Sequence, residues 1–288
     1  MTDSPPDDLR PIDPGEIPAR FGGRSPAALE RLTVDHLLAA NEWITESAPG
    51  ARRYEAQGVR AIATDLPAPL FNRALGARFG GLSGAEADAQ VDSLAAFFAA
   101  QEMPWEWWLD PAPQPADLPD RLAARGLRRL TVPVLALPLH PGLSPERDNQ
   151  LSVWQAADIE DLRIASFILC AAFGFEERVF QSYFEERPGR WFPGEPASLY
   201  LAREVDGPPV AIGALITMGG VAGVHLMATL PAWRRRGLAS LLIGHMLHVA
   251  ADAGHDLAVT TASKIGLGLG LRFGFSYLFD LLVFRSGE

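Results

Sequence analysis

The chain has 288 residues, of which 48% are hydrophobic and 21% charged, and its formal net charge is −10 at pH 7. This acidic balance argues against nucleic acid as a partner, because neutralising phosphates requires a basic surface. The composition is that of an ordinary soluble protein, no apolar run is long enough to span a bilayer, and the first residues lack the pattern of a secretory signal. We therefore expect a cytoplasmic protein with no membrane partner.

Turn-forming segments divide the chain. Residues 1–25 are dense in Pro, Asp and Gly and have no hydrophobic periodicity, which predicts a poorly ordered tail. A similar segment, residues 141–150, lies between two strand-like runs and is expected to be a linker. The length of the chain also favours two domains. We therefore expect one domain over residues 26–140 and another over residues 151–288.

The first half shows a faint alternation of strands and helices. The expected strands are 59–64, 105–109 and 129–137, and the expected helices are 84–100 and 117–125. Trp105, Trp107 and Trp108 fall in the second of these strands. We expect them in the core, with a place in a substrate pocket as the alternative.

The second half shows the pattern more clearly. Helices are expected from Asp158 to Phe173, over 176–186 and over 237–251; strands are expected over 197–205, 209–218, 224–230 and 256–262; a short glycine-rich helix and a terminal strand pair near 277–284 complete the chain. Antiparallel strands followed by a strand, helix and strand predict an α/β class with a mixed sheet.

A candidate anion site lies where the strand 224–230 meets the next helix. Helix N-termini present unpaired backbone N–H groups and partial positive charge, so a phosphate can bind there. Gly237 has no side chain to obstruct an anion, and Arg234, Arg235 and Arg236 provide charge-assisted donors before it. The segment predicts a diphosphate site, with a solvated basic turn as the alternative.

This segment resembles the pyrophosphate loop of the GNAT acetyltransferase superfamily, Arg/Gln-x-x-Gly-x-Gly/Ala, which is matched by Arg234-x-x-Gly237-x-Ala239. The stretch Arg272–Phe275 is similar to the one that precedes the last strands of that family. The resemblance covers residues 151–288, with the first half as a degenerate copy. It implies tandem GNAT-like domains, each a mixed, largely antiparallel sheet flanked by helices, and acetyl-CoA as the cosubstrate.

The resemblance also implies which residues bind acetyl-CoA. In the family, backbone groups of the strand before the loop hold the carbonyl and the pantetheine arm, while the loop and the first helical turn hold the diphosphate. These positions are Met227, Ala228, Thr229, Arg234, Arg235, Arg236, Gly237, Leu238, Ala239 and Ser240. For Ser240, a solvated side chain is the alternative. Ser263 stands where the family often has an asparagine that touches the pantetheine arm.

The catalytic groups are less complete. The usual general acid of the family is a tyrosine, and the alignment puts Gly270 at its position. Ser263 or water is expected to protonate the thiolate instead, because a thiol with a pKa of about 8.5 is a tolerable leaving group. His225 lies on the central strand, and a histidine pKa of about 6.5 suits proton removal near neutrality. We expect His225 as the base, with a packed or solvated side chain as the alternative.

Other chemistries find little support. The glycine-rich run 266–271 has a leucine at the third glycine position of a dinucleotide fingerprint, and no P-loop sequence is present. His245 and His248 lie three residues apart without an evident partner for a metal, so we expect no metal. Cys170, the one cysteine, is expected to be buried and unreactive.

We therefore expect an N-acetyltransferase that moves an acetyl group from acetyl-CoA to the amine of a small molecule. The alternatives are a catalytically weak acyl-CoA-binding or regulatory protein and a tandem-GNAT synthase that uses both halves to build its acceptor cleft. One acetyl-CoA is expected per chain, because Ser83 and Glu86 predict a capping box at the corresponding helix of the first half. No pattern in the sequence sets the acceptor or the oligomeric state.

Overall fold

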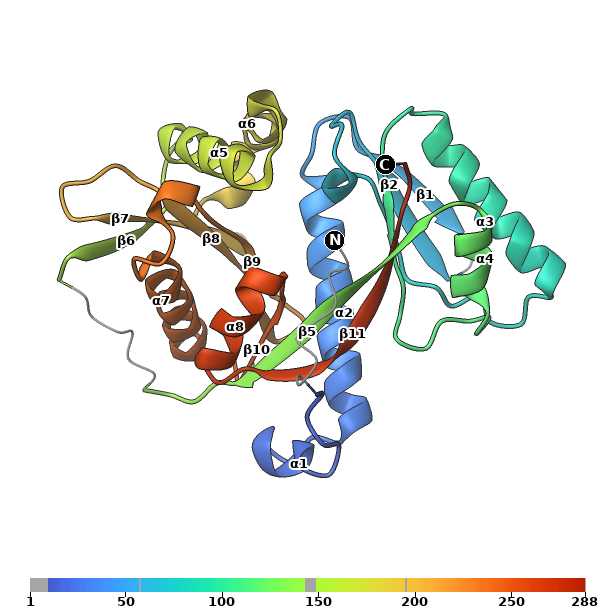
Figure 1. Ribbon diagram of the computed structural model, residues 1–288, viewed down its shortest axis with the longest axis horizontal. Coiled ribbons are helices and arrows are strands. Elements are labelled where there is room, and N and C mark those ends of the chain that lie inside the picture. The colour runs from blue at the N-terminus through green and yellow to red at the C-terminus, as the bar shows by residue number, and fades with distance from the viewer. Residues whose placement is uncertain (1–9, 57, 143–148, 195, 288) are drawn as a thin grey trace. The chain divides into compact units, whose positions relative to one another are not determined.

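The computed structural model describes residues 10–56, 58–142, 149–194 and 196–287, and these fall into two compact units. The first unit comprises Asn41–Pro133 and the residues from Asp280 on. The second comprises Val134–Phe279 and the described residues up to Ala40 (Figure 1). Each unit is described by itself below.

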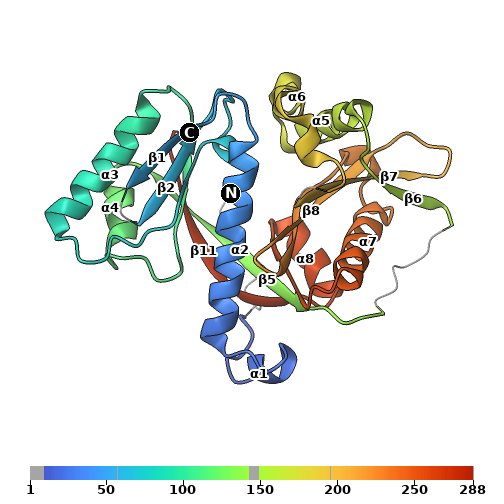
Figure 2. The same ribbon diagram turned by 180° about the vertical axis from the view of Figure 1, so that it is seen from behind.

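The first unit is built on a sheet with the strand order β1-β2-β3-β4-β11. Its elements are β1 (Arg52–Ala56), β2 (Val59–Ala63), a 3₁₀ turn (Pro69–Phe71), β3 (Arg73–Leu75), α3 (Gly84–Ala99), β4 (Glu106–Trp108), α4 (Leu118–Ala124), the start of β5 (Arg128–Pro138) and the end of β11 (Ser276–Arg285). The strands β3 and β4 are parallel and the other pairs antiparallel. Figure 2 shows α3 and α4 together beside β1 and β2.

The first unit has an aromatic core. Phe98 of α3 stacks on Trp105 with ring centroids 4.5 Å apart, and Phe79 meets Trp107 edge to face. Trp105, Trp107 and Trp108 are all buried, which confirms their expected place in the core. The helix α3 begins at a complete capping box of Ser83 and Glu86, as expected.

The second unit has the strand order β5-β10-β9-β8-β7-β6, in which β9 and β10 are parallel and the other pairs with a described register are antiparallel. Its elements are α1 (Ile17–Arg20), most of α2 (Pro26–Glu46), β6 (Leu151–Gln155), α5 (Ile159–Phe173), α6 (Glu177–Glu186), a 3₁₀ turn (Pro188–Trp191), β7 (Ala197–Glu204), β8 (Ala211–Met218), β9 (Val221–Thr229), a 3₁₀ turn (Pro231–Trp233), α7 (Leu238–Asp252), β10 (Leu257–Thr261) and α8 (Lys264–Arg272). Figure 1 shows α5 and α6 on one face of this sheet and α7 and α8 on the other.

The core of the second unit forms where α7 covers the sheet. Leu238, Leu242 and Met246 lie one helical turn apart on one face of α7, and each is almost fully buried. They pack with Val224 of β9 and other apolar side chains of the strands. Burying such side chains stabilises the fold by about 1.5–3 kcal/mol each, so α7 is fixed relative to β9.

The chain is divided differently from the expected domains 26–140 and 151–288. Helix α2 contributes its residues up to Ala40 to the second unit, and β11 contributes its residues from Asp280 to the first. The reason is pairing over long sequence separation, since Val283 and Phe284 of β11 pair with β4. Of the expected linker 141–150, residues 143–148 lie outside the described residues.

The expected poorly ordered tail also differs from the structure where it is described. Phe21 is fully buried, and Ile17 of α1 is nearly so. The backbone of Ile12 donates to the carbonyl of Tyr277, and Arg24 pairs with Asp256 at 2.6 Å. Residues 10–25 are therefore packed on the second unit, whereas residues 1–9 lie outside the described part.

Several elements have no counterpart in the sequence prediction. These are α1, α2, β1 and β3, whereas β6 lies where a strand-like run was expected after the linker. The expected terminal strand pair is a single strand of 10 residues, β11. The mixed α/β class with largely antiparallel pairing is confirmed. None of the helices within the described ranges is long and apolar enough to cross a membrane.

Candidate functional site

The strand β9 contains a bulge near its middle. Leu226 has a positive φ of 48°, and the register between β8 and β9 shifts at the same level. Gly213 of β8 lies there, and a side chain on it would run into Met227. In the described chain, the pairing of β9 with its parallel neighbour β10 stops at Val224. The bulge therefore marks the point where the ladder between these two strands ends.

The end of β9 contains the three residues that were expected to bind through their backbone. Ala228 and Thr229 pair with β8, so one edge of this segment is fully engaged. The carbonyl of Thr229 also accepts a hydrogen bond from Nε of Arg234 at 3.2 Å. Met227 points its side chain into the core against α7. The edge that faces β10 belongs to no ladder in the described residues, so its backbone groups can bind a ligand.

The N-terminus of α7 follows directly. Gly237 is its N-cap residue with a φ of 85°, a conformation in which other residues are strained. Within the described part of the chain no side chain caps this helix, in contrast to α3 and α8, which are capped by Ser83 and Ser263. The first bond of the helix is from Leu241 N to the carbonyl of Gly237. The N–H groups that precede Leu241 are therefore donors for an anion.

The three arginines before Gly237 differ in their surroundings. All are exposed, but Arg236 pairs with Glu204 at 3.1 Å and lies over the ring of Trp233. Arg234 uses its Nε on the carbonyl of Thr229. For Arg235, whose φ is 65°, the described residues provide no acidic partner. Arg235 is thus the arginine with the most donors left for a ligand, and Arg236 is the one most occupied by the protein itself.

In the first turn of α7, the groups available to a ligand are backbone N–H groups more than side chains. Leu238 is almost fully buried, so only its N–H can face a ligand. Ala239 and Ser240 are half-buried and follow in the same turn. The expected participation of Leu238 therefore reduces to its backbone, because its side chain belongs to the core of the second unit.

Ser263 lies beyond the end of β10. The strands β9 and β10 are parallel, with Thr260 opposite Val224. The chain that follows β10 therefore leaves the sheet at the same edge as the C-terminal end of β9. The hydroxyl oxygen of Ser263 caps α8 by accepting from the N–H of Gly266 at 3.2 Å. This bond uses a lone pair, so the hydroxyl proton remains available for donation.

Gly270 lies inside the second unit. A Cβ atom on it would come within 2.7 Å of Leu135 Cδ1, so a tyrosine does not fit at this position without displacing the core. A side chain at this position therefore requires Leu135 to shift. A substitution to tyrosine would test the missing acid and the packing of the core together.

His225 lies on β9 next to a histidine that the sequence gave no reason to select. Its Nε2 atom is 3.4 Å from Nε2 of His36 on α2, and the two rings are 5.6 Å apart. His36 is almost fully buried, and its Nδ1 atom is 3.2 Å from the carbonyl oxygen of Met218. Burial lowers the pKa of His36 to about 4, against the raising effect of the Met218 carbonyl and with a lesser lowering by His255.

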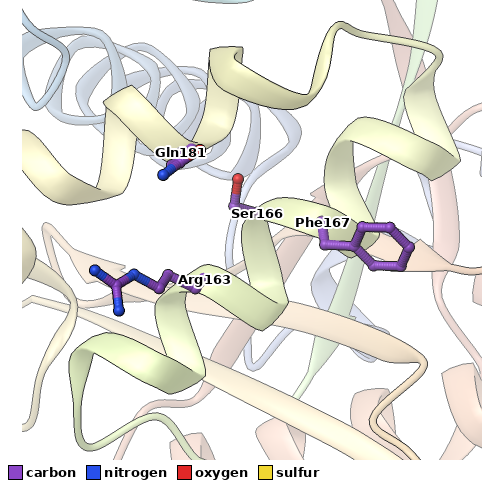
Figure 3. A pocket seen from close by; sticks show the side chains of 4 residues that line it. All are labelled: Arg163, Ser166, Phe167 and Gln181. Atoms are coloured by element: carbon purple, nitrogen blue, oxygen red, sulfur yellow. The ribbon is translucent and has the colours of Figure 1, made fainter.

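A small pocket lies between α5 and α6 on the other face of the sheet. It has a volume of about 200 Å³ and is lined by Arg163, Ser166, Phe167 and Gln181. Figure 3 shows Ser166 and Gln181 on facing helices, with Arg163 and Phe167 to either side of Ser166. Phe167 is 54% exposed and Phe173, at the end of the same helix, is 49% exposed.

The remaining candidates behave as structural residues. Cys170 is buried, as expected, and donates to the carbonyl of Glu176. His248 pairs with Asp252 at 3.3 Å, and His245 packs edge to face on Tyr200. Burial lowers the pKa of His245, and nearby His248 lowers it further. Among the described residues, no group of three or more potential ligands gathers around a metal position.

Comparison with known proteins shows similarity in sequence for part of the chain and in fold for most of it. Residues 158–275 match the Acetyltransferase (GNAT) family. The chain is 33% identical over 107 residues to a mycothiol acetyltransferase from Clavibacter sepedonicus. That match covers 37% of this chain and 34% of the relative, so the chain spans about a third of the length of this curated protein.

Solved structures share the fold over most of the chain. A GCN5-related N-acetyltransferase from Kribbella flavida has a TM-score of 0.66 at 22% identity, covering 88% of this chain and 95% of its own. A tandem GNAT protein from the clavulanic acid biosynthesis pathway has a TM-score of 0.59 at 15% identity, covering 83% and 84% of the two chains. At these identities the likeness establishes the fold.

Proposed function

We propose, from the premise that residues 158–275 form a GNAT acetyltransferase domain in a chain with a tandem GNAT fold, that this protein transfers an acetyl group from acetyl-CoA to the amine of a small molecule. The name of the curated relative, an acetyltransferase, supports acetyl as the group transferred. The acceptor and the site residues are part of this proposal.

One observation carries the proposal. The uncapped N-terminus of α7, with Gly237 in the left-handed conformation and Arg235 beside it, follows directly on the bulged end of β9. The first feature suits a diphosphate, because backbone N–H groups and the helix dipole favour an anion there. The second provides backbone donors and acceptors of the kind that an extended amide-containing arm requires. A single ligand that carries both chemistries is coenzyme A.

The chemistry follows from the residues around this opening. The amine nitrogen forms a bond to the acetyl carbon, the carbon–sulfur bond breaks, and its electron pair leaves with the sulfur. His225 takes the proton from the amine, and the sulfur takes a proton from water or from the hydroxyl of Ser263, so that an amide and a free thiol result. Solvent then reprotonates Ser263 and takes the proton from His225, which restores both groups. In this proposal, the backbone N–H groups of Met227 to Thr229 that do not pair with β8 stabilise the negative charge that develops on the carbonyl oxygen.

The acceptor is proposed to be a small neutral or cationic amine. The net charge of −10 repels anionic acceptors and attracts cations at long range. The proposal is tested by incubating the intact protein with acetyl-CoA and a panel of amines, and measuring both free thiol and acetylated amine. Matched yields of the two products are expected for at least one amine.

The role of His225 predicts a change in pH dependence. In the wild type, kcat/KM is expected to fall on the acidic side as the base becomes protonated. His225→Gln removes the titrating group, so this acidic limb should disappear and the rate should drop by about 10²–10⁴-fold. The measurement is kcat/KM from pH 5 to pH 9. A limb that persists unchanged in the variant assigns the base to another group.

The arginines predict unequal effects on binding. Arg235→Ala should weaken acetyl-CoA binding by about 1.5–3 kcal/mol, the range for a hydrogen bond to a charged group. Arg236→Ala should cost less than about 1 kcal/mol, because Arg236 is paired with Glu204 at the surface. Isothermal titration calorimetry measures both. Equal losses in the two variants would mean that the Glu204 pair opens when the ligand binds.

The stoichiometry is predicted to be one acetyl-CoA per chain. In the first unit, Ser83 and Glu86 occupy the donors at the start of α3, and Asp88 pairs with Arg121 and Arg125 in its opening turns. Calorimetry on the intact chain should give a value near one. The intact chain is required, because a fragment of residues 1–140 lacks the part of β11 that pairs with β4. Two equivalent sites would establish the first unit as a cofactor-binding domain.

A further inference from the structure

Two imidazoles meet over a glycine in the second unit. His36 comes from α2 and His225 from β9, and their Nε2 atoms are 3.4 Å apart. Gly223 lies two residues before His225, so both occupy the same face of β9. A Cβ atom on Gly223 would overlap Nε2 of both histidines. The close approach of the two rings therefore depends on the absence of a side chain at this position.

The backbone fixes the tautomer of His36. Its Nδ1 atom lies 3.2 Å from the carbonyl oxygen of Met218, and a carbonyl only accepts, so Nδ1 carries the hydrogen. Because burial lowers the pKa of His36 to about 4, the ring is neutral near pH 7. A neutral ring protonated on Nδ1 has its lone pair on Nε2, the atom that faces His225.

The tautomer of His225 follows from that of His36. A lone pair on Nε2 of His36 accepts a hydrogen bond, so Nε2 of His225 is the donor. The neutral His225 ring then carries its lone pair on Nδ1. When His225 takes a proton it takes it on Nδ1, and its Nε2–H continues to donate to His36, so no proton moves onto the buried ring.

We propose that His36 is a positioning residue, which holds His225 through the bond between their Nε2 atoms and so fixes the tautomer and the orientation of the proposed base. This inference rests on the proposed function. A hydrogen-bond acceptor behind an imidazole also stabilises the imidazolium, in the manner of the third member of a catalytic triad. His255 also acts on His36 electrostatically, and its Nδ1 lies 3.2 Å from the carbonyl oxygen of Gly220.

The test separates positioning from support of the fold. His36→Phe keeps a ring and removes both nitrogens. It is expected to lower kcat/KM about tenfold or more, the equivalent of one hydrogen bond to a charged group, and to move the acidic limb to lower pH. In a His225→Gln background the same change should have no further effect on turnover. His36→Gln, whose amide oxygen can accept from His225, should restore part of the rate.

The control is His255→Gln, which also removes a histidine whose Nδ1 contacts the turn between β8 and β9, through the carbonyl of Gly220, and which should leave the acidic limb in place. A second readout needs no turnover: long-range ¹H–¹⁵N correlation on the intact protein should show His36 protonated on Nδ1 and His225 on Nε2. The opposite tautomers, or an equal loss in the wild-type and His225→Gln backgrounds, would overturn the inference. Absence of acetyl transfer would overturn the proposed function instead. The two tautomers would still show whether Nε2 of His36 accepts a hydrogen bond from His225.

Discussion

Gly237→Glu is expected to abolish the stabilisation of this protein by acetyl-CoA. At a ligand concentration about 100 times Kd, a specific ligand adds about 2.7 kcal/mol to the free energy of unfolding, which appears as a rise in Tm. A glutamate at the start of α7 places a negative charge among the donors that the diphosphate needs. It also strains a backbone whose φ is 85°. The measurement is the thermal melt with and without acetyl-CoA.

Strain and charge are separated by a control at the other end of the same helix. Gly254 has a φ of 86° and open space around it, so Gly254→Glu introduces the same charge and the same backbone strain away from the proposed site. Both variants strain a left-handed glycine, and the helix dipole makes the charge more costly at Gly254 than at Gly237, but only Gly237→Glu should lose the response to acetyl-CoA. An unchanged shift in Gly237→Glu contradicts the placement of the diphosphate.

Glu106→Gln is expected to cause a large loss of stability in the first unit. Glu106 accepts from Arg73 at 2.9 Å, from Arg285 at 2.8 Å and from the indole of Trp108 at 2.7 Å. The side chains of Arg73 and Glu106 are only 5% and 3% exposed. Removing one partner of a buried pair leaves the other charge uncompensated, at a cost of about 3–5 kcal/mol. Urea denaturation at neutral pH measures this loss.

The same network predicts the pH dependence of this loss. Burial raises the pKa of Glu106, but the charges of Arg73 and Arg285 and the bond from Trp108 outweigh it, so the pKa lies below its ordinary value. The stabilisation is thus present above the ordinary glutamate pKa and is lost as pH falls through the lowered native pKa. The difference between wild type and Glu106→Gln should therefore shrink in acid.

An exposed ion pair provides the matched control for Glu106. Arg52 and Asp65 are 2.8 Å apart, but about half of each side chain is exposed. Asp65→Asn should therefore cost less than about 1 kcal/mol. Equal losses in Asp65→Asn and Glu106→Gln would mean that the buried network contributes no more than a surface pair.

The second unit was largely predictable because its signals are local. The turn at Gly219 and Gly220 and the stripe of Leu238, Leu242 and Met246 mark β8, β9 and α7, which lie within a few residues of their expected bounds. The proposed anion site could be selected from the sequence for the same reason, since a strand, a basic turn and a glycine before a helix are adjacent in sequence. Which of the three arginines keeps its donors for a ligand depends on the ion pair between Arg236 and Glu204. Glu204 is distant in sequence, so this pair was not predictable.

The first unit was less predictable because it depends on contacts between residues far apart in the sequence. The same holds for the contributions of α2 to the second unit and of β11 to the first. Glu106 pairs with Arg285 across 179 residues, and His36 meets His225 across 189. The helix α2 has a mixed surface in which Thr33, His36 and Asn41 are buried among apolar side chains, which weakens its helical periodicity. The role of such a buried polar residue depends on the residues that it contacts in the fold, so no local sequence pattern identifies His36.

Acetyl transfer itself is tested most directly by following both products in one reaction. The intact protein is incubated with acetyl-CoA and the amine panel, and released thiol and acetylated amine are measured for the wild type, His225→Gln and Gly237→Glu. The account predicts equal amounts of the two products in the wild type, a large loss in His225→Gln and none of either product above background in Gly237→Glu. Tight binding of acetyl-CoA by the wild type without transfer to any amine would contradict it, and would instead describe an acyl-CoA-binding protein.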